Sequence, residues 1–193
     1  MAQRDRFGGQ FDAVLTAAQC GAPWAQERMF TALAPVVTGY LRMQGSTEPE
    51  DLTSDVFLAV LRNLTGFAGD ERGFRSWVFT IAHRRLLDER RRARRRPPPG
   101  PLADAPDAPL PELAAPDDVE GRVERALGVE RVRALCERLV PGQRDVLLLR
   151  LLSELSIDEI AATLGKSPGA VKALQRRGFM AVGRLLEREG VPL

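Results

Sequence analysis

The residues best suited to chemistry lie between positions 155 and 177, where cationic and amide side chains recur at helical spacing. Arginine, lysine and glutamine donate hydrogen bonds to phosphates and to base edges in the major groove of DNA. The candidates for such contacts are Ser167, Lys172, Gln175, Arg176 and Arg177. Their spacing therefore predicts a helix face that binds duplex DNA.

Two short helices and a tight turn must position that face. Apolar residues at helical spacing mark the inner side of the first helix, and Gly165 ends it. Ser167 can cap the second helix, and Pro168 fits its first turn. Three residues of the second helix are expected to be buried: Ala170, Val171 and Leu174. The pattern predicts a helix-turn-helix, with an ordinary helical hairpin whose polar face is solvated as the alternative.

A second group of candidate nucleic-acid contacts lies between positions 67 and 96, where aromatic residues precede a run of arginines. Aromatic rings stack on unpaired bases, and arginines bind phosphates. Eight arginines fall within positions 84–96, which is more than a helix C-terminus needs for its dipole. At least half of the aromatic residues at positions 67, 74, 77 and 79 are expected to be core. The others are expected to contact nucleic acid.

A third candidate surface lies on the helix predicted near Pro49–Leu64. Its acidic residues suit a helix N-terminus, and its apolar stripe suits a core. The face left over carries Asp51, Ser54, Asp55 and Leu58. By periodicity alone these four residues belong to an ordinary surface helix.

The composition offers little for catalysis or metal binding. His83 is the single histidine, and Cys20 and Cys136 fit neither a disulfide framework nor a metal site. No nucleophile with an adjacent base is evident, so we expect no catalytic residue, no metal, no cofactor and no enzymatic activity. The chain shows no signal-peptide pattern and no apolar run of membrane-spanning length. We therefore expect a cytoplasmic protein with reduced thiols and no membrane insertion of its own.

Apolar periodicity near 3.6 residues recurs along the chain and predicts an all-α protein of two small helical domains joined by a flexible, proline-rich linker. The first domain spans residues 11–95, with helices near Phe11–Ala18, Ala25–Gln44, Pro49–Leu64 and Gly73–Arg95. The acidic segment 96–118 contains eight prolines and is predicted to be the linker. The second domain spans 119–189, with a helix to Leu139, a break at Pro141, a helix to Leu152 and then the helix-turn-helix.

Together these segments resemble the extracytoplasmic-function (ECF, group IV) sigma factors, the small two-domain class of bacterial RNA polymerase specificity subunits. Four pieces appear in the family's order: EDLTSDVFLAVL, FRSWVFTIAHRRLLDERRR, a variable linker, and LVPGQRDVLLLRLLSELSIDEIAATLGKSPGAVKALQRR. The resemblance extends from about Gln26 to Leu186. It implies a sigma factor that directs bacterial core RNA polymerase to promoter DNA and that an anti-sigma factor holds inactive.

The resemblance also implies a role for each candidate surface. The region 2-like first domain would bind the polymerase through Asp51, Ser54, Asp55 and Leu58. It would read and melt the minus-ten element through Phe67, Trp77, His83, Arg84 and Arg85. The region 4-like second domain would read the minus-thirty-five element through Ser167, Lys172, Gln175, Arg176 and Arg177, and the linker would run toward the active-site and RNA-exit channels of the polymerase.

Two positions depart from the family's pattern. Ser54 stands where the family commonly has Gln, and Arg84 stands where some relatives place an Asn that contacts a minus-ten base.

The alternatives to a sigma factor are a DNA-binding regulator that acts without polymerase and an interaction protein such as an adaptor or decoy. A stand-alone regulator would bind palindromic duplex by itself.

Overall fold

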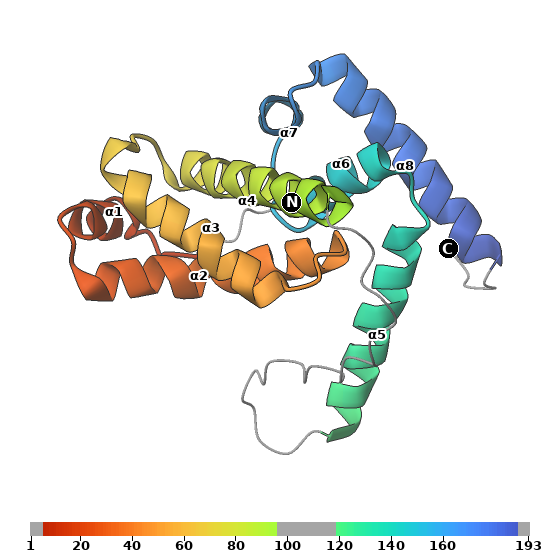
Figure 1. Cartoon of the computed structure of the whole chain (residues 1–193), viewed down its shortest axis with the longest axis horizontal. Coiled ribbons are helices and arrows are strands. Elements are labelled where there is room, and N and C mark those ends of the chain that lie inside the picture. Colours follow the sequence, from red (N-terminus) through yellow and green to blue (C-terminus); the bar gives the residue numbers. More distant parts are fainter. Residues whose placement is uncertain (1–5, 96–118, 189–193) are drawn as a thin grey trace.

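The computed structural model describes residues 6–95 and 119–188, with side chains for 6–95 and 128–188, and groups their helices in two domains (Figure 1). The first domain contains α1 (Phe11–Gln19), α2 (Pro23–Met43), α3 (Pro49–Asn63), the short 3₁₀-helix η1 (Leu64–Gly66) and α4 (Glu71–Arg95). The second contains α5 (Val119–Glu137), α6 (Pro141–Leu151), α7 (Ile157–Leu164) and α8 (Pro168–Arg188). The described ranges hold no strand, so the all-α prediction is confirmed. The predicted linker 96–118 and residue 189 lie outside them.

The core of the first domain forms where α2, α3 and α4 pack together. Tyr40 of α2 and Phe79 of α4 are fully buried, and their rings meet edge to face at 5.5 Å. Phe74, also fully buried, contacts Phe11 of α1 at 5.7 Å. Large aromatic rings bury much apolar area, so these two contacts fix α4 against α2 and α1. The long helix α4 lies at the side of the first domain that meets the second domain (Figure 1).

Local capping sets the turn of the helix-turn-helix. Gly165 adopts a left-handed conformation (φ 61°) directly after α7, and Ser167 Oγ accepts a hydrogen bond from the Ala170 amide at 3.2 Å. Pro168 begins α8. These features confirm the predicted end of the first helix of the helix-turn-helix and the predicted start of its second helix. A capping box at the start of α7 was signalled by the Ser156-x-x-Glu159 pattern, which our sequence analysis did not use.

The structure corrects one predicted core position. Val171 is fully buried and Leu174 half-buried, but Ala170 is exposed. Successive helix residues are rotated by about 100°, so the position before Val171 turns away from the side that packs inward. A close approach between helices is instead seen at Gly178 of α8, where an added Cβ would lie 2.9 Å from Leu147 Cδ1 of α6.

Replacing Gly178 by alanine should destabilise the second domain. The new methyl overpacks against buried Leu147, at a cost of about 1–3 kcal/mol that exceeds the helix-propensity gain of about 1 kcal/mol. Gly183, in the same helix, has open space around it, so Gly183→Ala should stabilise by up to about 1 kcal/mol. Thermal unfolding followed by circular dichroism measures the melting temperature of each variant. Equal changes in the two melting temperatures would contradict the close approach at Gly178.

Candidate nucleic-acid interface

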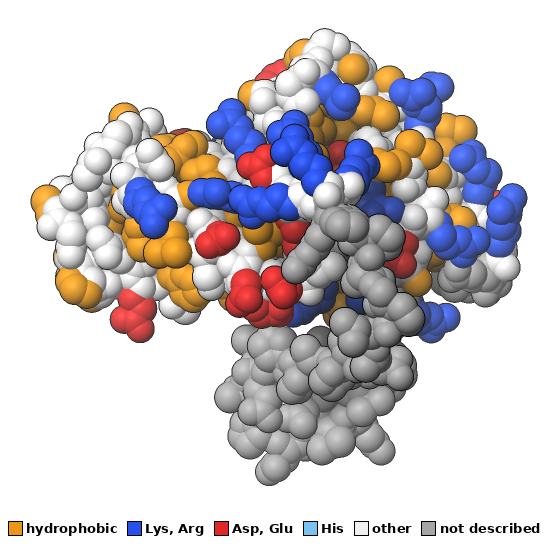
Figure 2. Space-filling model, in the orientation of Figure 1, with side chains coloured by type: hydrophobic (Ala, Val, Ile, Leu, Met, Phe, Trp, Pro, Cys, Tyr) orange, Lys and Arg blue, Asp and Glu red, His pale blue; other side chains and the backbone are white. Residues whose placement is uncertain are grey.

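Helix α8 presents the candidate face for duplex DNA. Lys172, Arg176 and Arg177 are exposed, and Gln175 is half-buried. Lys172, Gln175 and Arg176 are spaced three and four residues apart and so share one face of the helix. Arg177 turns to the side, where its Nε donates to the Ala173 carbonyl at 3.2 Å. Figure 2 shows lysine and arginine side chains gathered along this helix.

A second candidate site is a hollow next to η1 and α4. Phe67 and Trp77 stack with ring centroids 5.2 Å apart and an interplanar angle of 25°. Both line an open hollow of about 460 Å³, together with Asn63, Gly66 and Ala68. Its volume lies within the range of pockets that hold small organic groups. A flat aromatic wall beside an exposed amide suits an unpaired base, which offers a ring face and a polar edge.

The loop between η1 and α4 positions the Phe67 ring. Gly69 has a φ of 157°, and an added Cβ there would lie 3.1 Å from the ring of Phe67. Asp70 Oδ1 accepts a hydrogen bond from the Gly73 amide at 2.8 Å, which fixes the loop to the start of α4. Sequence analysis selected Phe67 and Trp77 but missed Asn63, Gly66 and Ala68 as lining residues, because their small or amide side chains carry no distinctive spacing.

The open side of α4 joins the hollow to the arginine run. Trp77 and Arg84 are seven residues apart and therefore share a face. Arg84 is exposed and Arg85 half-buried, and Figure 2 shows basic side chains gathered along α4. Phe74 and Phe79 are fully buried. The expectation that at least half of the aromatic residues of this segment are core is confirmed.

His83 lies on another side of α4 and is only 4% exposed. Its Nδ1 lies 2.8 Å from the Tyr40 hydroxyl in a buried hydrogen bond. The predicted contact of His83 with DNA is therefore not available in this arrangement, because Tyr40 and the second domain enclose the ring. Arg75, about two turns earlier on α4, is likewise buried at 3% exposure.

Burial governs the ionisation of this polar cluster. It lowers the pKa of His83, with Arg90 adding to the effect and Asp145 of α6 opposing it. Burial also raises the pKa of Tyr40 far above its ordinary value, and here Asp145 adds to the effect. Gln44 Nε2 donates to Asp145 Oδ1 at 2.9 Å and lies 3.4 Å from the Tyr40 hydroxyl. The cluster is therefore built around a neutral histidine and a neutral tyrosine.

The lowered pKa of His83 predicts a loss of stability in mild acid. Below its ordinary pKa of 6.5 the ring of the unfolded chain is protonated, whereas the buried ring stays neutral to a lower pH. The free energy of unfolding should therefore fall as the pH drops from 6.5 through the lowered pKa, with a limiting slope of about 1.4 kcal/mol per pH unit. Urea unfolding at pH 7.5, 6.5 and 5.5 measures this free energy of unfolding. His83→Gln should flatten this dependence, and an unchanged slope in that variant would assign the effect to other groups.

The face of α3 predicted to bind the polymerase is open. Asp51, Ser54 and Asp55 are exposed, and Leu58 is 50% exposed. Phe30 of α2, 43% exposed, packs edge to face on Phe57 at 4.9 Å beside this helix, and sequence analysis did not select it. The structure thus brings the four predicted residues together on one surface that no part of the described chain covers.

Metal-ligand clusters and membrane-spanning helices are both absent from the described part of the chain. The described side chains, those of 6–95 and 128–188, include no cluster of three or more His, Cys, Asp or Glu that could hold a metal ion. Within the same part of the chain, no helix is long and apolar enough to cross a membrane.

Comparison with known proteins matches both domains to sigma factor families. Residues 29–96 match the Sigma-70 region 2 model, and residues 130–182 match a Sigma-70 region 4 model. The ECF RNA polymerase sigma factor ShbA of Streptomyces griseus is 37% identical over 142 residues, which are 72% of this chain and 72% of ShbA. BldN, an ECF sigma factor of Streptomyces coelicolor, is 34% identical over 173 residues, 88% of this chain. The chain spans 63% of the length of BldN.

A solved structure shares the fold. The sigma factor RpoE of Bartonella quintana, crystallised with the anti-sigma factor NepR, aligns with a TM-score of 0.61 over 83% of this chain and 96% of that one, at 18% identity. The two domain matches and the relatives define the class: the chain is a sigma factor, a DNA-binding protein of promoter-specific transcription initiation. Within that class it belongs to the ECF RNA polymerase sigma factors.

Proposed function

We propose that this chain reads both the minus-thirty-five and the minus-ten elements of its promoters and melts the DNA at the second. The observation that carries the proposal is the pairing of two open nucleic-acid faces on separate domains. One is the basic face of α8, and the other is the aromatic hollow of Phe67 and Trp77 beside the arginines of α4. No covalent chemistry is assigned to the chain.

Duplex recognition at the minus-thirty-five element is assigned to the start of α8. The second helix of a helix-turn-helix enters the major groove with its N-terminal residues against base edges. Lys172 and Arg176 are exposed there, and Gln175 supplies an amide for an adenine edge. Ser167 serves the site indirectly, since its hydroxyl caps the helix.

Recognition and melting at the minus-ten element are assigned to the hollow and to Arg84 and Arg85. A base removed from the stack costs a few kcal/mol, and stacking on an aromatic wall returns about 1–3 kcal/mol. The stacked pair of Phe67 and Trp77 offers such a wall, while the exposed Arg84 lies on the same helix face for a phosphate. Binding and melting therefore draw on the same contacts.

Polymerase binding is assigned to the open face of α3, with Leu58 as its apolar centre and Asp51, Ser54 and Asp55 around it.

The proposal includes domain limits of 11–95 and 119–189, membership of group IV and a cytoplasmic location. It also includes an anti-sigma factor as inhibitor, supported by the RpoE relative that binds one.

The first experiment is size-exclusion chromatography of the chain with bacterial core RNA polymerase at rising salt. One-to-one co-elution is expected. Leu58→Arg should weaken the complex at least tenfold, because it places a charge at the centre of an apolar contact. Thr16→Arg adds the same charge to an exposed site on α1 and should leave co-elution unchanged.

Absence of co-elution by the folded native chain would sink the proposal. Tight binding of palindromic duplex by the free chain would then favour a stand-alone regulator. If Leu58→Arg and Thr16→Arg reduced co-elution equally, the assignment to the α3 face would be refuted. The proposal that the native chain binds polymerase would still stand.

Two substitutions should fail at different steps of initiation. Arg176→Ala should reduce duplex binding by the holoenzyme through loss of a base or phosphate contact, by about 1–3 kcal/mol. Trp77→Ala should leave closed-complex binding near native and reduce melting at least tenfold, because it removes half of the stacked pair. The test uses promoters that the native holoenzyme selects from random DNA. Duplex binding is measured on them directly, and permanganate footprinting of melted thymines measures melting. A Trp77→Ala chain that melts DNA normally would contradict the role of the hollow.

A further inference from the structure

The last residue of α1 reaches the segment that leads into the aromatic hollow. Gln19 Nε2 donates to the Leu64 carbonyl at 2.9 Å and to the Phe67 carbonyl at 2.8 Å. Leu64 begins η1, and Phe67 directly follows it. Both partners are carbonyl oxygens, which only accept, so the side-chain amide must present its NH₂ group to them. One side chain of α1 therefore bridges the two ends of this segment.

The backbone of Phe67 is held on both sides. Its amide donates to the Leu64 carbonyl at 3.0 Å, and its own carbonyl accepts from Gln19. Each of these groups belongs to a planar peptide unit, so the two contacts fix the two planes that meet at the Phe67 Cα. The direction of the Cα–Cβ bond follows from those planes. Gln19 consequently helps to aim the Phe67 ring at Trp77, on which it stacks with centroids 5.2 Å apart.

Helix α1 is a firm base for this contact because its inner side belongs to the core. Phe11 and Ala18 are both buried, and the Phe11 ring lies 5.7 Å from that of Phe74. The Phe74 ring in turn lies 5.3 Å from Phe67 and 5.9 Å from Trp77. Aromatic packing therefore ties α1 to the hollow on one side of Phe67, and the Gln19 amide holds the backbone of the same residue.

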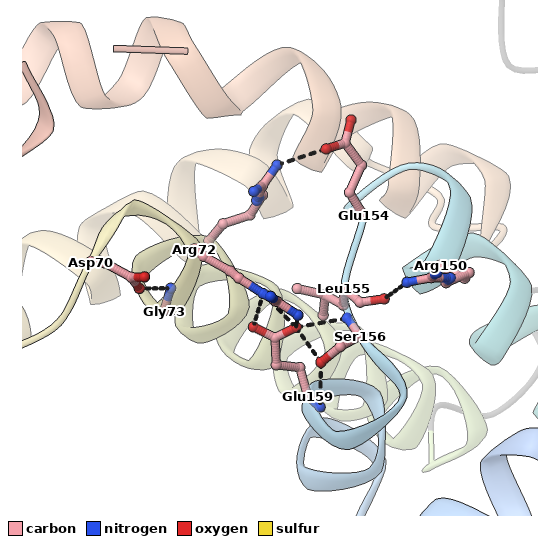
Figure 3. A network of polar contacts seen from close by, with 9 residues as sticks. Asp70, Arg72, Gly73, Arg150, Glu154, Leu155, Ser156 and Glu159 are labelled. Atoms are coloured by element: carbon pink, nitrogen blue, oxygen red, sulfur yellow. Dashed lines mark hydrogen bonds and ion pairs between the residues drawn. The ribbon is translucent and has the colours of Figure 1, made fainter. Parts of the chain in front are cut away.

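The other end of the loop is held separately by α4. Asp70 Oδ1 accepts a hydrogen bond from the Gly73 amide at 2.8 Å, and Figure 3 shows this contact at the start of the helix. The loop between Phe67 and Asp70 is thus anchored to α1 at one end and to α4 at the other. The aromatic wall of the hollow is formed before any ligand arrives.

We propose that Gln19 is a positioning residue of the minus-ten hollow, which holds the Phe67 ring stacked on Trp77 for the capture of an unpaired base. The inference rests on the proposed function for its consequence, while the positioning itself stands on the contacts above. The hollow is lined by other residues, so Gln19 acts through Phe67 and does not touch the base. Part of the minus-ten machinery then lies in α1, outside residues 29–96 that match the region 2 model.

A preformed wall matters because base capture is nearly balanced. Removal of a base from the stack costs about as much free energy as stacking on an aromatic ring returns. If the wall had to be ordered first, the ordering free energy would be subtracted from that return. Loss of the Gln19 contacts should therefore reduce melting without changing the residues that meet the DNA.

The first test measures the positioning in the free chain. The protein has two tryptophans, and Trp24 is 55% exposed, so Trp24→Phe leaves Trp77 as the single emitter in a folded chain. In this background Gln19→Met should shift the Trp77 emission to longer wavelength, because water reaches the ring face that Phe67 covers. Circular dichroism verifies native helix content. An emission spectrum unchanged by Gln19→Met would overturn the proposal.

Gln26→Met is the matched control for every measurement. Gln26 is also half-buried, and its Nε2 donates to the Ala18 carbonyl at 3.3 Å. The control therefore removes an amide contact at the same end of α1 but none to the loop. It should leave both the Trp77 emission and promoter melting as in the native chain.

The second test measures melting by the holoenzyme, with permanganate footprinting on promoters that the native holoenzyme selects from random DNA. Gln19→Met, which keeps the length of the side chain but removes the donor, should reduce melting about fivefold at unchanged closed-complex binding. Gln19→Glu should reduce it at least as much, because its carboxylate would face two carbonyl oxygens. Native melting in Gln19→Met, or an equal loss in Gln26→Met, would overturn the proposal.

A double-mutant cycle separates positioning from a general loss of stability. Phe67→Leu keeps an apolar side chain in the loop but removes the flat ring that Gln19 is proposed to aim. In the Phe67→Leu background, Gln19→Met should change melting by less than about twofold, because residues that act through one another are not additive. The same fivefold loss in both backgrounds would show that Gln19 does not act through Phe67.

The two proposals fail separately. A native holoenzyme that melts no selected promoter would refute the proposed function and the consequence drawn for Gln19, while the Trp77 emission still decides whether Gln19 positions Phe67. Normal melting in both Gln19 variants, with a loss in Trp77→Ala, would refute the role of Gln19 and leave the proposed function standing.

Discussion

Helix α4 must satisfy three different surroundings at once, and the rest of the structure depends on this constraint. One side carries Phe74 and Phe79 into the aromatic core of the first domain. A second side carries Trp77 and Arg84 to the open hollow, and a third meets the second domain through Arg72 and Thr80. A helix turns about 100° per residue, so neighbouring residues fall into different environments. Each substitution in α4 therefore affects one surface selectively.

The basic character that suits α4 for DNA also attracts acids of its own chain. Carboxylates of the second domain occupy arginines that nucleic acid would otherwise reach, and they do so in partly desolvated surroundings. Buried ion pairs give little net stability, because desolvation offsets much of their attraction. These pairs therefore orient the second domain on α4 while adding little to the net stability of the chain.

Sequence reasoning succeeded where the physics is local. The turn at Gly165, the cap by Ser167 and the start of α8 at Pro168 each depend on a few adjacent residues, and the structure confirms them. The four predicted residues of α3 emerge on one open face because helical periodicity alone decides it. His83 differed from expectation, since its burial depends on Tyr40 and Asp145, which pack against it from distant parts of the chain.

The sequence by itself determined the helices, their order, the placement of basic and aromatic side chains along them, and the sigma factor resemblance. Those properties follow from periodicity, capping and residue chemistry over short distances. Only the tertiary structure decided which basic residues remain open. Arg75 and His83 read like their neighbours in sequence, but long-range packing encloses them against Glu154, Tyr40 and Asp145. Burial is set by the element that arrives from far along the chain, and no local spacing encodes that.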